Sequence, residues 1–252
     1  MGSEDRAMQV FFDIHDDIPR GGPGSRASTG RAFGMLDQLR ESPVILDIGC
    51  GPGRQTLDLA GLSGGSIIAV DNHEAFLKRL SEEVKRYGLQ DRVTVIKGDM
   101  LDLGFAPGTF DAIWAEGAIY IIGFERGLRQ WRSLLREGGY VAVTEVSWLR
   151  PDPPEELAAF WKEQYPAIQS IEENEATLCR CGYRPVGQFI LPESDWWDHY
   201  YTPILEKIST LRQKYTDDPV AIEVIQMEER EIGLYRRYSG YNGYVFYVAQ
   251  ID

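Results

Sequence analysis

The stretch VILDIGCGPG, residues 44–53, is an apolar run that ends in a glycine-rich loop. An apolar run without polar alternation is typical of a strand buried on both faces. From Arg54 onward, apolar residues recur at helical spacing until the sequence Ser63-Gly-Gly65 ends the pattern. The run SIIAV at 66–70 then indicates a second buried strand. Strand, glycine loop, helix and strand in this order predict a βαβ unit.

The same alternation continues along the chain. We expect a helix over 73–87, a strand over 92–96, a strand over 110–115, a helix over 124–136 and a strand over 140–146. Beyond Trp148 we expect helices over 156–165 and 170–181 and strands over 183–191 and 243–251. This pattern predicts an α/β fold with a doubly wound, mainly parallel sheet, because right-handed crossovers place helices on both faces.

The domain organisation that we predict is a single domain over 1–252. Residues 1–40 form its N-terminal cap, with MGSEDRA frayed, a helix over 8–20, a loop over 21–30 and a helix over 31–39. Residues 192–240 carry two amphipathic helical patterns between the last two strands. An insertion this long is often a functional lid. The alternative is a dimerisation surface or a structural appendage, because amphipathic helices often only pack.

Composition excludes several classes of function. The net charge of −13 and the lack of a Lys/Arg block argue against nucleic acid or an anionic membrane as a partner. No stretch approaches the ~20 apolar residues of a membrane span, and the N-terminus lacks a signal-peptide pattern. The three cysteines are odd in number, and Cys179 and Cys181 lack further metal ligands nearby. We therefore expect free thiols, no metal, a cytoplasmic location, and a monomer or homodimer.

The glycine loop is the first candidate binding element. Glycines at 49, 51 and 53 let the backbone approach a ligand closely. A nicotinamide-cofactor site of the G-x-G-x-x-G type would need glycine where Arg54 stands. Asp47, two residues before the first glycine, suits a ligand with an ammonium group instead.

Two further acids follow the next strands. Asp71 ends the second strand, where a carboxylate accepts hydrogen bonds from ribose hydroxyls. Asp99 follows the third strand, where it could accept from an adenine amino group while Met100 packs on the ring. Each acid alone could be a turn residue. Three acids at the carboxyl ends of consecutive parallel strands predict one shared ligand site.

These segments resemble a known family. ILDIGCGPG, AVD, KGDM, FDAIWAEGAIY and LREGGYVAV occur in the order of the motifs of class I S-adenosylmethionine (SAM)-dependent methyltransferases. WAEGAIYIIGFERG, with FFDIHDDIPRGGPGS upstream and GYVFYVAQ near the end, resembles a bacterial subgroup acting on small molecules. The Asn-Pro-Pro-Tyr motif of many nucleic-acid amino methyltransferases is absent, and that position reads Ala115-Glu-Gly-Ala118.

The resemblance implies a seven-stranded sheet with the last strand antiparallel, SAM as cofactor and S-adenosylhomocysteine (SAH) as product. It also implies a set of cofactor-binding residues, namely Asp47, Gly49, Cys50, Gly51, Gly53, Thr56, Asp71, Asn72, Gly98, Asp99, Met100 and Glu116.

Catalytic residues are harder to predict, because alignment of the reactants can supply much of the rate without a base. Glu116 at the end of the fourth strand is one candidate base; the alternative is that it orients the cofactor. His15 and His199 are candidates because histidine titrates near neutral pH. Each could instead be a hydrogen-bonded, partly buried histidine.

For the acceptor pocket we expect aromatic side chains, namely Tyr120, Trp148, Trp196 and Tyr200. Such a lining suits an apolar acceptor or a cationic amine, although aromatic residues are more often core. The predicted function is methyl transfer from SAM to a small molecule. The alternatives are methylation of a protein or peptide, and a SAM-binding protein without catalysis.

Overall fold

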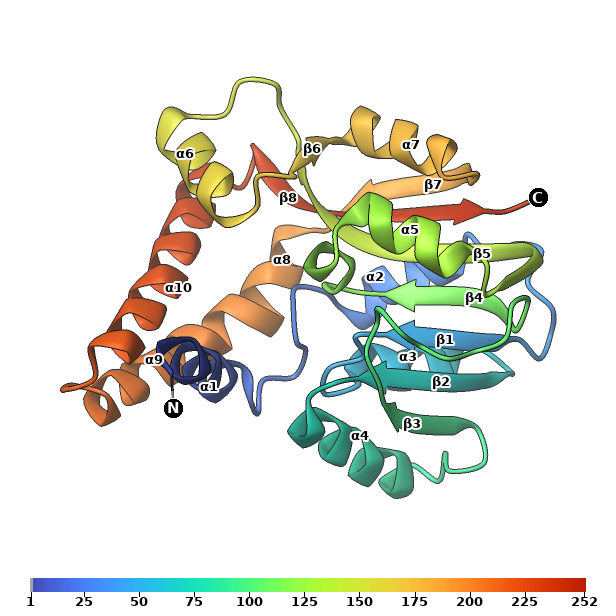
Figure 1. Ribbon diagram of the computed structural model, residues 1–252, viewed down its shortest axis with the longest axis horizontal. Helices are drawn as coiled ribbons and strands as arrows, with labels where there is room; N and C mark the ends of the chain where they lie inside the picture. Colours follow the sequence, from blue (N-terminus) through green and yellow to red (C-terminus); the bar gives the residue numbers. More distant parts are fainter. Residues whose placement is uncertain (1) are drawn as a thin grey trace.

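The computed structural model describes residues 2–252 and contains one central sheet (Figure 1). The strand order is β3-β2-β1-β4-β5-β8-β7, with β8 antiparallel to both of its neighbours. The strands are β1 (Val44–Ile48), β2 (Ser66–Asp71), β3 (Val93–Lys97), β4 (Phe110–Ala115), β5 (Leu135–Trp148), β7 (Arg184–Ile190) and β8 (Asn242–Gln250). The predicted seven-stranded, mainly parallel sheet is therefore confirmed. A two-residue strand, β6 (Gln169–Ser170), also pairs with the end of β5.

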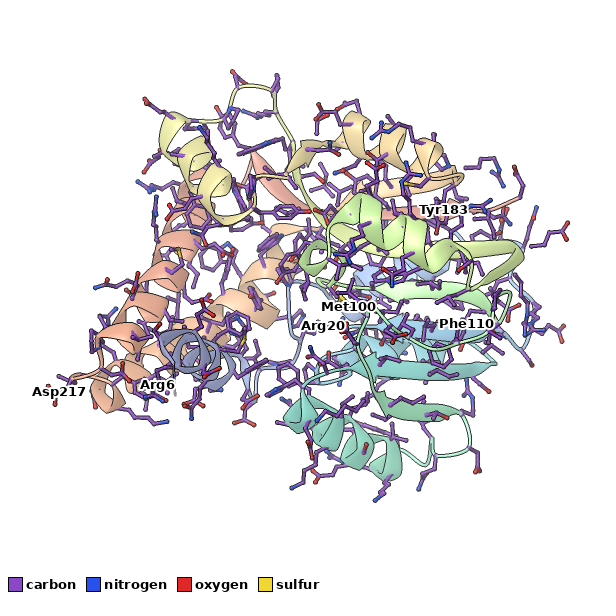
Figure 2. The ribbon with its side chains drawn as sticks, viewed as in Figure 1. Arg6, Arg20, Met100, Phe110, Tyr183 and Asp217 are labelled. Carbon is purple, nitrogen blue, oxygen red and sulfur yellow. The ribbon has the colours of Figure 1, made fainter. Side chains whose placement is uncertain are left out.

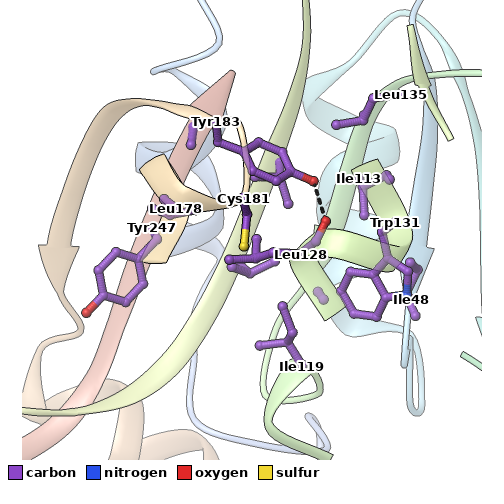
Figure 3. Packing of buried hydrophobic residues seen from close by; sticks show 14 of the residues in the cluster. Ile48, Ile113, Ile119, Leu128, Trp131, Leu135, Leu178, Cys181, Tyr183 and Tyr247 are labelled. Atoms are coloured by element: carbon purple, nitrogen blue, oxygen red, sulfur yellow. Dashed lines mark hydrogen bonds between the residues drawn. The ribbon is translucent and has the colours of Figure 1, made fainter. Parts of the chain in front are cut away.

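Helices cover both faces of the sheet. On one face, α2 (Arg26–Phe33), α3 (Arg54–Leu62) and α4 (Glu74–Arg86) pack over a cluster that includes Trp114 and Phe246. On the other face, α5 (Phe124–Arg132) and α7 (Ile171–Arg180) pack over a cluster around Trp131 (Figure 3). There the Tyr183 hydroxyl donates to the Leu128 carbonyl at 2.9 Å and joins the start of β7 to α5.

Several predicted boundaries are wrong at the ends of elements: the helix expected over 8–20 ends at His15, the helix expected over 31–39 ends at Phe33, and the strand expected over 140–146 begins at Leu135. α1 (Ser3–His15) begins inside the segment expected to be frayed, and Arg6 pairs with Asp218 at 2.7 Å. α2 begins within the predicted loop, because the Ser25 side chain accepts the Ser28 amide and caps the helix. The helix expected over 124–136 ends at Arg132, since residues from Leu135 onward belong to β5.

A second group of helices, which we call the helical body, consists of α1, α8 (Glu193–Trp196), η2 (Trp197–Tyr201), α9 (Thr202–Lys214) and α10 (Pro219–Tyr238). It has a hydrophobic cluster of its own, including Val10, Ile204 and Ile225. It faces the carboxyl ends of the parallel strands (Figure 1). α6 (Glu155–Gln164) packs near the end of α10 through Phe160 and Leu234, and the short η1 (Ile119–Ile121) follows β4. No helix within residues 2–252 is long and apolar enough to cross a membrane.

Candidate functional site

A cavity of about 1050 Å³ lies where the sheet meets the helical body. Figure 2 shows two of its lining residues, Arg20 and Met100, near this boundary. The loops after β1, β2, β3 and β4 form one side of the cavity, and α1 and α10 form the other. This is the edge at which open α/β sheets bind ligands.

The glycine loop forms part of the cavity wall. Gly49, Cys50 and Gly51 line the cavity, whereas Gly53 lies outside it as the N-cap of α3. Gly49 has a φ of 69°, and a Cβ there would come within 2.4 Å of the Ala118 Cβ. The loop therefore needs glycine both for its backbone conformation and for close packing.

The two acids predicted after β2 and β3 both line this cavity. Asp71 accepts the Gly51 amide through Oδ2 at 2.9 Å and the His73 amide through Oδ1 at 2.8 Å. Asp99 accepts the Leu101 amide at 2.9 Å. Each carboxylate oxygen has more than one lone pair, so both acids can still accept from a ligand. The neighbouring residues Asn72, Gly98 and Met100 line the cavity as well.

Asp47 and Thr56 lie behind the glycine loop, outside the cavity lining. The Thr56 hydroxyl donates to Asp47 Oδ2 at 2.6 Å, and Asp47 Oδ1 has no hydrogen-bond partner among residues 2–252. Burial raises the pKa of Asp47 to about 7, and the Glu116 and Asp71 charges add to this shift. A positive charge above the loop would favour the ionised form, so the buried acid fits a cofactor that carries an ammonium group.

Glu116 lines the cavity from the end of β4 and is held by three donors. Trp114 Nε1 and Thr29 Oγ1 both donate to its Oε1 at 2.8 Å, and Arg20 Nη1 donates to Oε2 at 3.1 Å. Arg20 also donates to the buried Asp58. Burial raises the pKa of Glu116, although Arg20 and the other donors oppose that shift. This geometry is typical of a carboxylate that holds its surroundings in place.

Both histidines predicted as bases lie outside the cavity lining. His15 is buried in the helical body, where Nδ1 lies 2.8 Å from the Phe11 carbonyl oxygen and Nε2 lies 3.1 Å from the Tyr200 hydroxyl. Burial lowers the pKa of His15 to about 4. His199 lines a separate cavity of about 490 Å³ with Pro19 and Arg54. The structure therefore gives neither side chain access to the predicted reaction site.

Of the four aromatic residues predicted for the acceptor pocket, only Tyr120 lines the cavity. Trp196 is buried within the helical body and stacks on Tyr235 with ring centroids 4.4 Å apart. Trp148 packs against the cluster near α6, and Tyr200 points its hydroxyl at His15. Trp196 and Tyr200 belong to the hydrophobic core of the helical body, whereas Trp148, at the end of β5, packs against the separate cluster near α6.

Sequence reasoning missed much of the wall opposite the glycine loop. The missed residues of this wall are Met8, Gly21, Gly22, Val220, Glu223, Val224, Met227, Glu228 and Glu231, and Phe11 and Phe12 line it beside them. The sequence of α10 does contain a signal for this wall. Val220, Val224, Met227, Glu228 and Glu231 recur at helical spacing, which puts two glutamates on an otherwise apolar face of the helix. Within residues 2–252, no group of three His, Cys, Asp or Glu side chains forms a candidate metal site.

Comparisons with known proteins agree with this geometry. Residues 45–139 match the family described as "Methyltransferase domain". A sterol 24-C-methyltransferase of Pneumocystis carinii is 26% identical over 185 residues, covering 69% of this chain and 49% of that enzyme. The chain thus spans about half the length of this relative.

Two solved structures resemble almost the whole chain. One is YjhP of Escherichia coli, with a TM-score of 0.78, 20% identity and coverage of 98% of this chain and 99% of that one. The other is a SAM-dependent methyltransferase of Geobacter sulfurreducens in complex with SAH, with a TM-score of 0.75, 23% identity and 98% coverage of both chains. The sheet order and these likenesses show the fold of class I SAM-dependent methyltransferases, and residues 45–139 match a methyltransferase-domain family.

Proposed function

We propose that the protein transfers a methyl group from SAM to a small-molecule acceptor. The continuity of the cavity is the main support, because it extends from the glycine loop to a chamber walled by α1, η1 and α10. Its volume of about 1050 Å³ is at the upper end of the roughly 300–1,000 Å³ of ligand pockets. A cavity of that size has room for the cofactor and a second small molecule.

The residues on the sheet side fit the cofactor. Asp71, Asp99 and Met100 would hold the nucleoside, and the loop from Gly49 to Gly51 would face the amino-acid part, with Asp47 beneath it. When bound there, SAM supplies a methyl group on a positively charged sulfur. The protein's task is then to orient the acceptor and exclude water, and alignment alone can contribute about 7–11 kcal/mol.

The other wall provides the means to enclose the acceptor. Phe11 and Phe12 of α1 and Tyr120 of η1 line the cavity with apolar surface. Glu116 is the one predicted base that reaches the cavity, and its three donors favour a positioning role over proton transfer. We therefore propose that the insertion over 192–240 acts as a lid, because its helix α10 lines the cavity. His15 and His199 have no part in the reaction that we propose.

The names of the relatives are consistent with a small acceptor, since they include a sterol methyltransferase and a geranyl diphosphate methyltransferase. A protein acceptor would need an open surface at the methyl position, which walls on both sides of the cavity disfavour. We also propose a cytoplasmic location, because Cys50, Cys179 and Cys181 are free thiols, the state that a reducing compartment maintains.

Turnover against a metabolite library, measured as SAH release, tests the proposal. We expect release with at least one small molecule and its loss in the variant Asp71→Ala. Tight SAH binding without turnover of any member, together with methylation of added protein, would contradict a small-molecule acceptor.

A further inference from the structure

Three acids of α10 line the cavity: Glu223, which is exposed, and the less exposed pair Glu228 and Glu231. Glu228 and Glu231 line it together with Val224 and Met227, on the same face of the helix. Glutamates three positions apart repel each other, and burying them adds a desolvation cost. Two glutamates that point into a cavity from an apolar helix face are stabilised when a positive charge lies between or beside their carboxylates.

The protein itself does not provide that charge for Glu228. Its side chain is 12% exposed, and no residue among 2–252 forms a hydrogen bond to it. The closest basic atom is His15 Nε2, 3.9 Å from Glu228 Oε1. The Phe11 carbonyl can only accept, so His15 Nδ1 carries a proton, and burial lowers the pKa of His15 to about 4, which disfavours a second proton on Nε2.

Glu231 has a hydroxyl as its partner and no cation. The Tyr201 hydroxyl donates to its Oε1 at 2.9 Å. Burial raises the pKa of Glu228 to about 8, with a contribution from the Glu231 charge, and burial also raises the pKa of Glu231. A cation in the chamber would reverse this cost, because it would favour the ionised carboxylates.

The remaining cavity lining makes the chamber selective for positive charge. Its basic side chains within residues 2–252 are Arg20 and His73. Arg20 already pairs with Glu116 and Asp58, and His73 stacks on Phe12 with ring centroids 3.7 Å apart. The chamber therefore combines carboxyl groups that lack a cationic partner with aromatic faces, which attract cations.

We propose that the acceptor is a cationic amine with an apolar body, whose ammonium group is held by Glu228 and Glu231 beside the rings of Phe11 and Tyr120. The Phe11 ring stacks on His15 with centroids 4.0 Å apart, and His15 Nε2 lies 3.9 Å from Glu228 Oε1, so Phe11 lies near the acids; Tyr120 lines the same cavity. The inference rests on the proposed function, which assigns the other half of the cavity to SAM. It adds the chemical class of the acceptor.

The test uses the full chain saturated with SAH and two probes of the same shape. Benzyltrimethylammonium carries the charge, and neopentylbenzene replaces its nitrogen with carbon. Equilibrium dialysis should show the ammonium probe binding at least about tenfold more tightly, as expected for a desolvated cation beside rings and carboxylates. This preference should disappear in the double variant Glu228→Gln/Glu231→Gln.

The matched control is Glu229→Gln. Glu229 lies on the same helix but pairs with Arg212 at 2.6 Å and is 40% exposed, away from the cavity lining. It removes one carboxylate from α10, as Glu228→Gln does, and should keep the preference for the ammonium probe. If the double variant folds poorly, Glu228→Gln alone decides the outcome, because it leaves the hydrogen bond from Tyr201 in place.

Two results would overturn the inference. One is equal binding of both probes by the parent protein; the other is an unchanged preference in a folded Glu228→Gln variant that still binds SAH. Failure of the proposed function is distinguishable, since it would appear as absent SAH binding or absent methyl transfer to every small molecule, whatever the charge of the probe.

Discussion

Replacing Arg20 with methionine should destabilise the protein strongly, because this arginine joins two buried carboxylates. It donates to Glu116 at 3.1 Å and to Asp58, and the side chains of Arg20, Asp58 and Glu116 are 5%, 2% and 5% exposed. Methionine keeps an apolar stem of similar reach and removes only the charged head. Both acids then remain buried without their cation.

The expected magnitude follows from that burial. Removing one partner of a buried ion pair costs about 3–5 kcal/mol. In a domain of 150–250 residues, each kcal/mol lowers the melting temperature by about 2–4 °C, which gives a decrease of about 6–20 °C. Near pH 5 the loss should be smaller, because burial raises the pKa of Glu116, and a Glu116 carboxyl that takes up a proton no longer needs the cation.

Thermal unfolding followed by circular dichroism measures the effect, with Arg26→Met as the matched control. Arg26 Nη1 lies 3.8 Å from Asp58 Oδ1, but the side chain is 65% exposed, so its loss should cost less than about 1 kcal/mol. Equal melting temperatures for the two variants at neutral pH would refute the role that we assign to Arg20.

Three further predictions concern the cofactor site and the core. Asp71→Ala should weaken SAH binding about 10- to 150-fold in calorimetry through loss of a charged acceptor, while Asp91→Ala on the surface should not; equal affinities would contradict the ribose assignment. Burial raises the pKa of Glu145 to about 8, so the folded state holds a proton that the unfolded state has lost, and the free energy of unfolding should decrease as pH rises from about 4.5 to 8. In denaturant titrations, Glu145→Gln should make this decrease shallower by up to about 1.4 kcal/mol per pH unit. An unchanged slope would count against a protonated Glu145 in the folded state. Gly53→Ala should lower the free energy of unfolding by about 2–5 kcal/mol, because φ is 87° and a Cβ would collide with a leucine of α4 at 2.2 Å. Gly88→Ala should lower it by less, because φ is 67° there and a Cβ would meet open space. If Gly88→Ala destabilises the protein more than Gly53→Ala, this packing argument is refuted.

Most of the fold could be predicted because its determinants are local. The strand at 110–115 is visible as an apolar run, and its bounds agree with β4. The glycine loop is visible because its backbone conformation and close contacts require glycine. α2 was misplaced at its start because Ser25 was taken as part of a loop, although serine is a common N-cap.

The candidate site was predicted mainly on the cofactor side, where residues follow consecutive strands; of the side chains expected in the acceptor pocket, Tyr120 alone lines the cavity. The other wall depends on contacts between distant segments, such as Arg20 with Glu116 and His15 with Tyr200. No local pattern shows that a histidine on the first helix will bond to a tyrosine 185 positions away. The inward face of α10 was visible as amphipathic, but its contact with the cavity was not.

The most direct test of the central claim follows a labelled methyl group. The parent protein and Asp71→Ala are each incubated with methyl-labelled SAM and a small-molecule extract, and the label is measured separately in small molecules and in protein. Our account predicts that the label passes to a small molecule with the parent and at a much lower rate with Asp71→Ala under subsaturating SAM. Binding of SAH by the parent without transfer of label to any small molecule would contradict it.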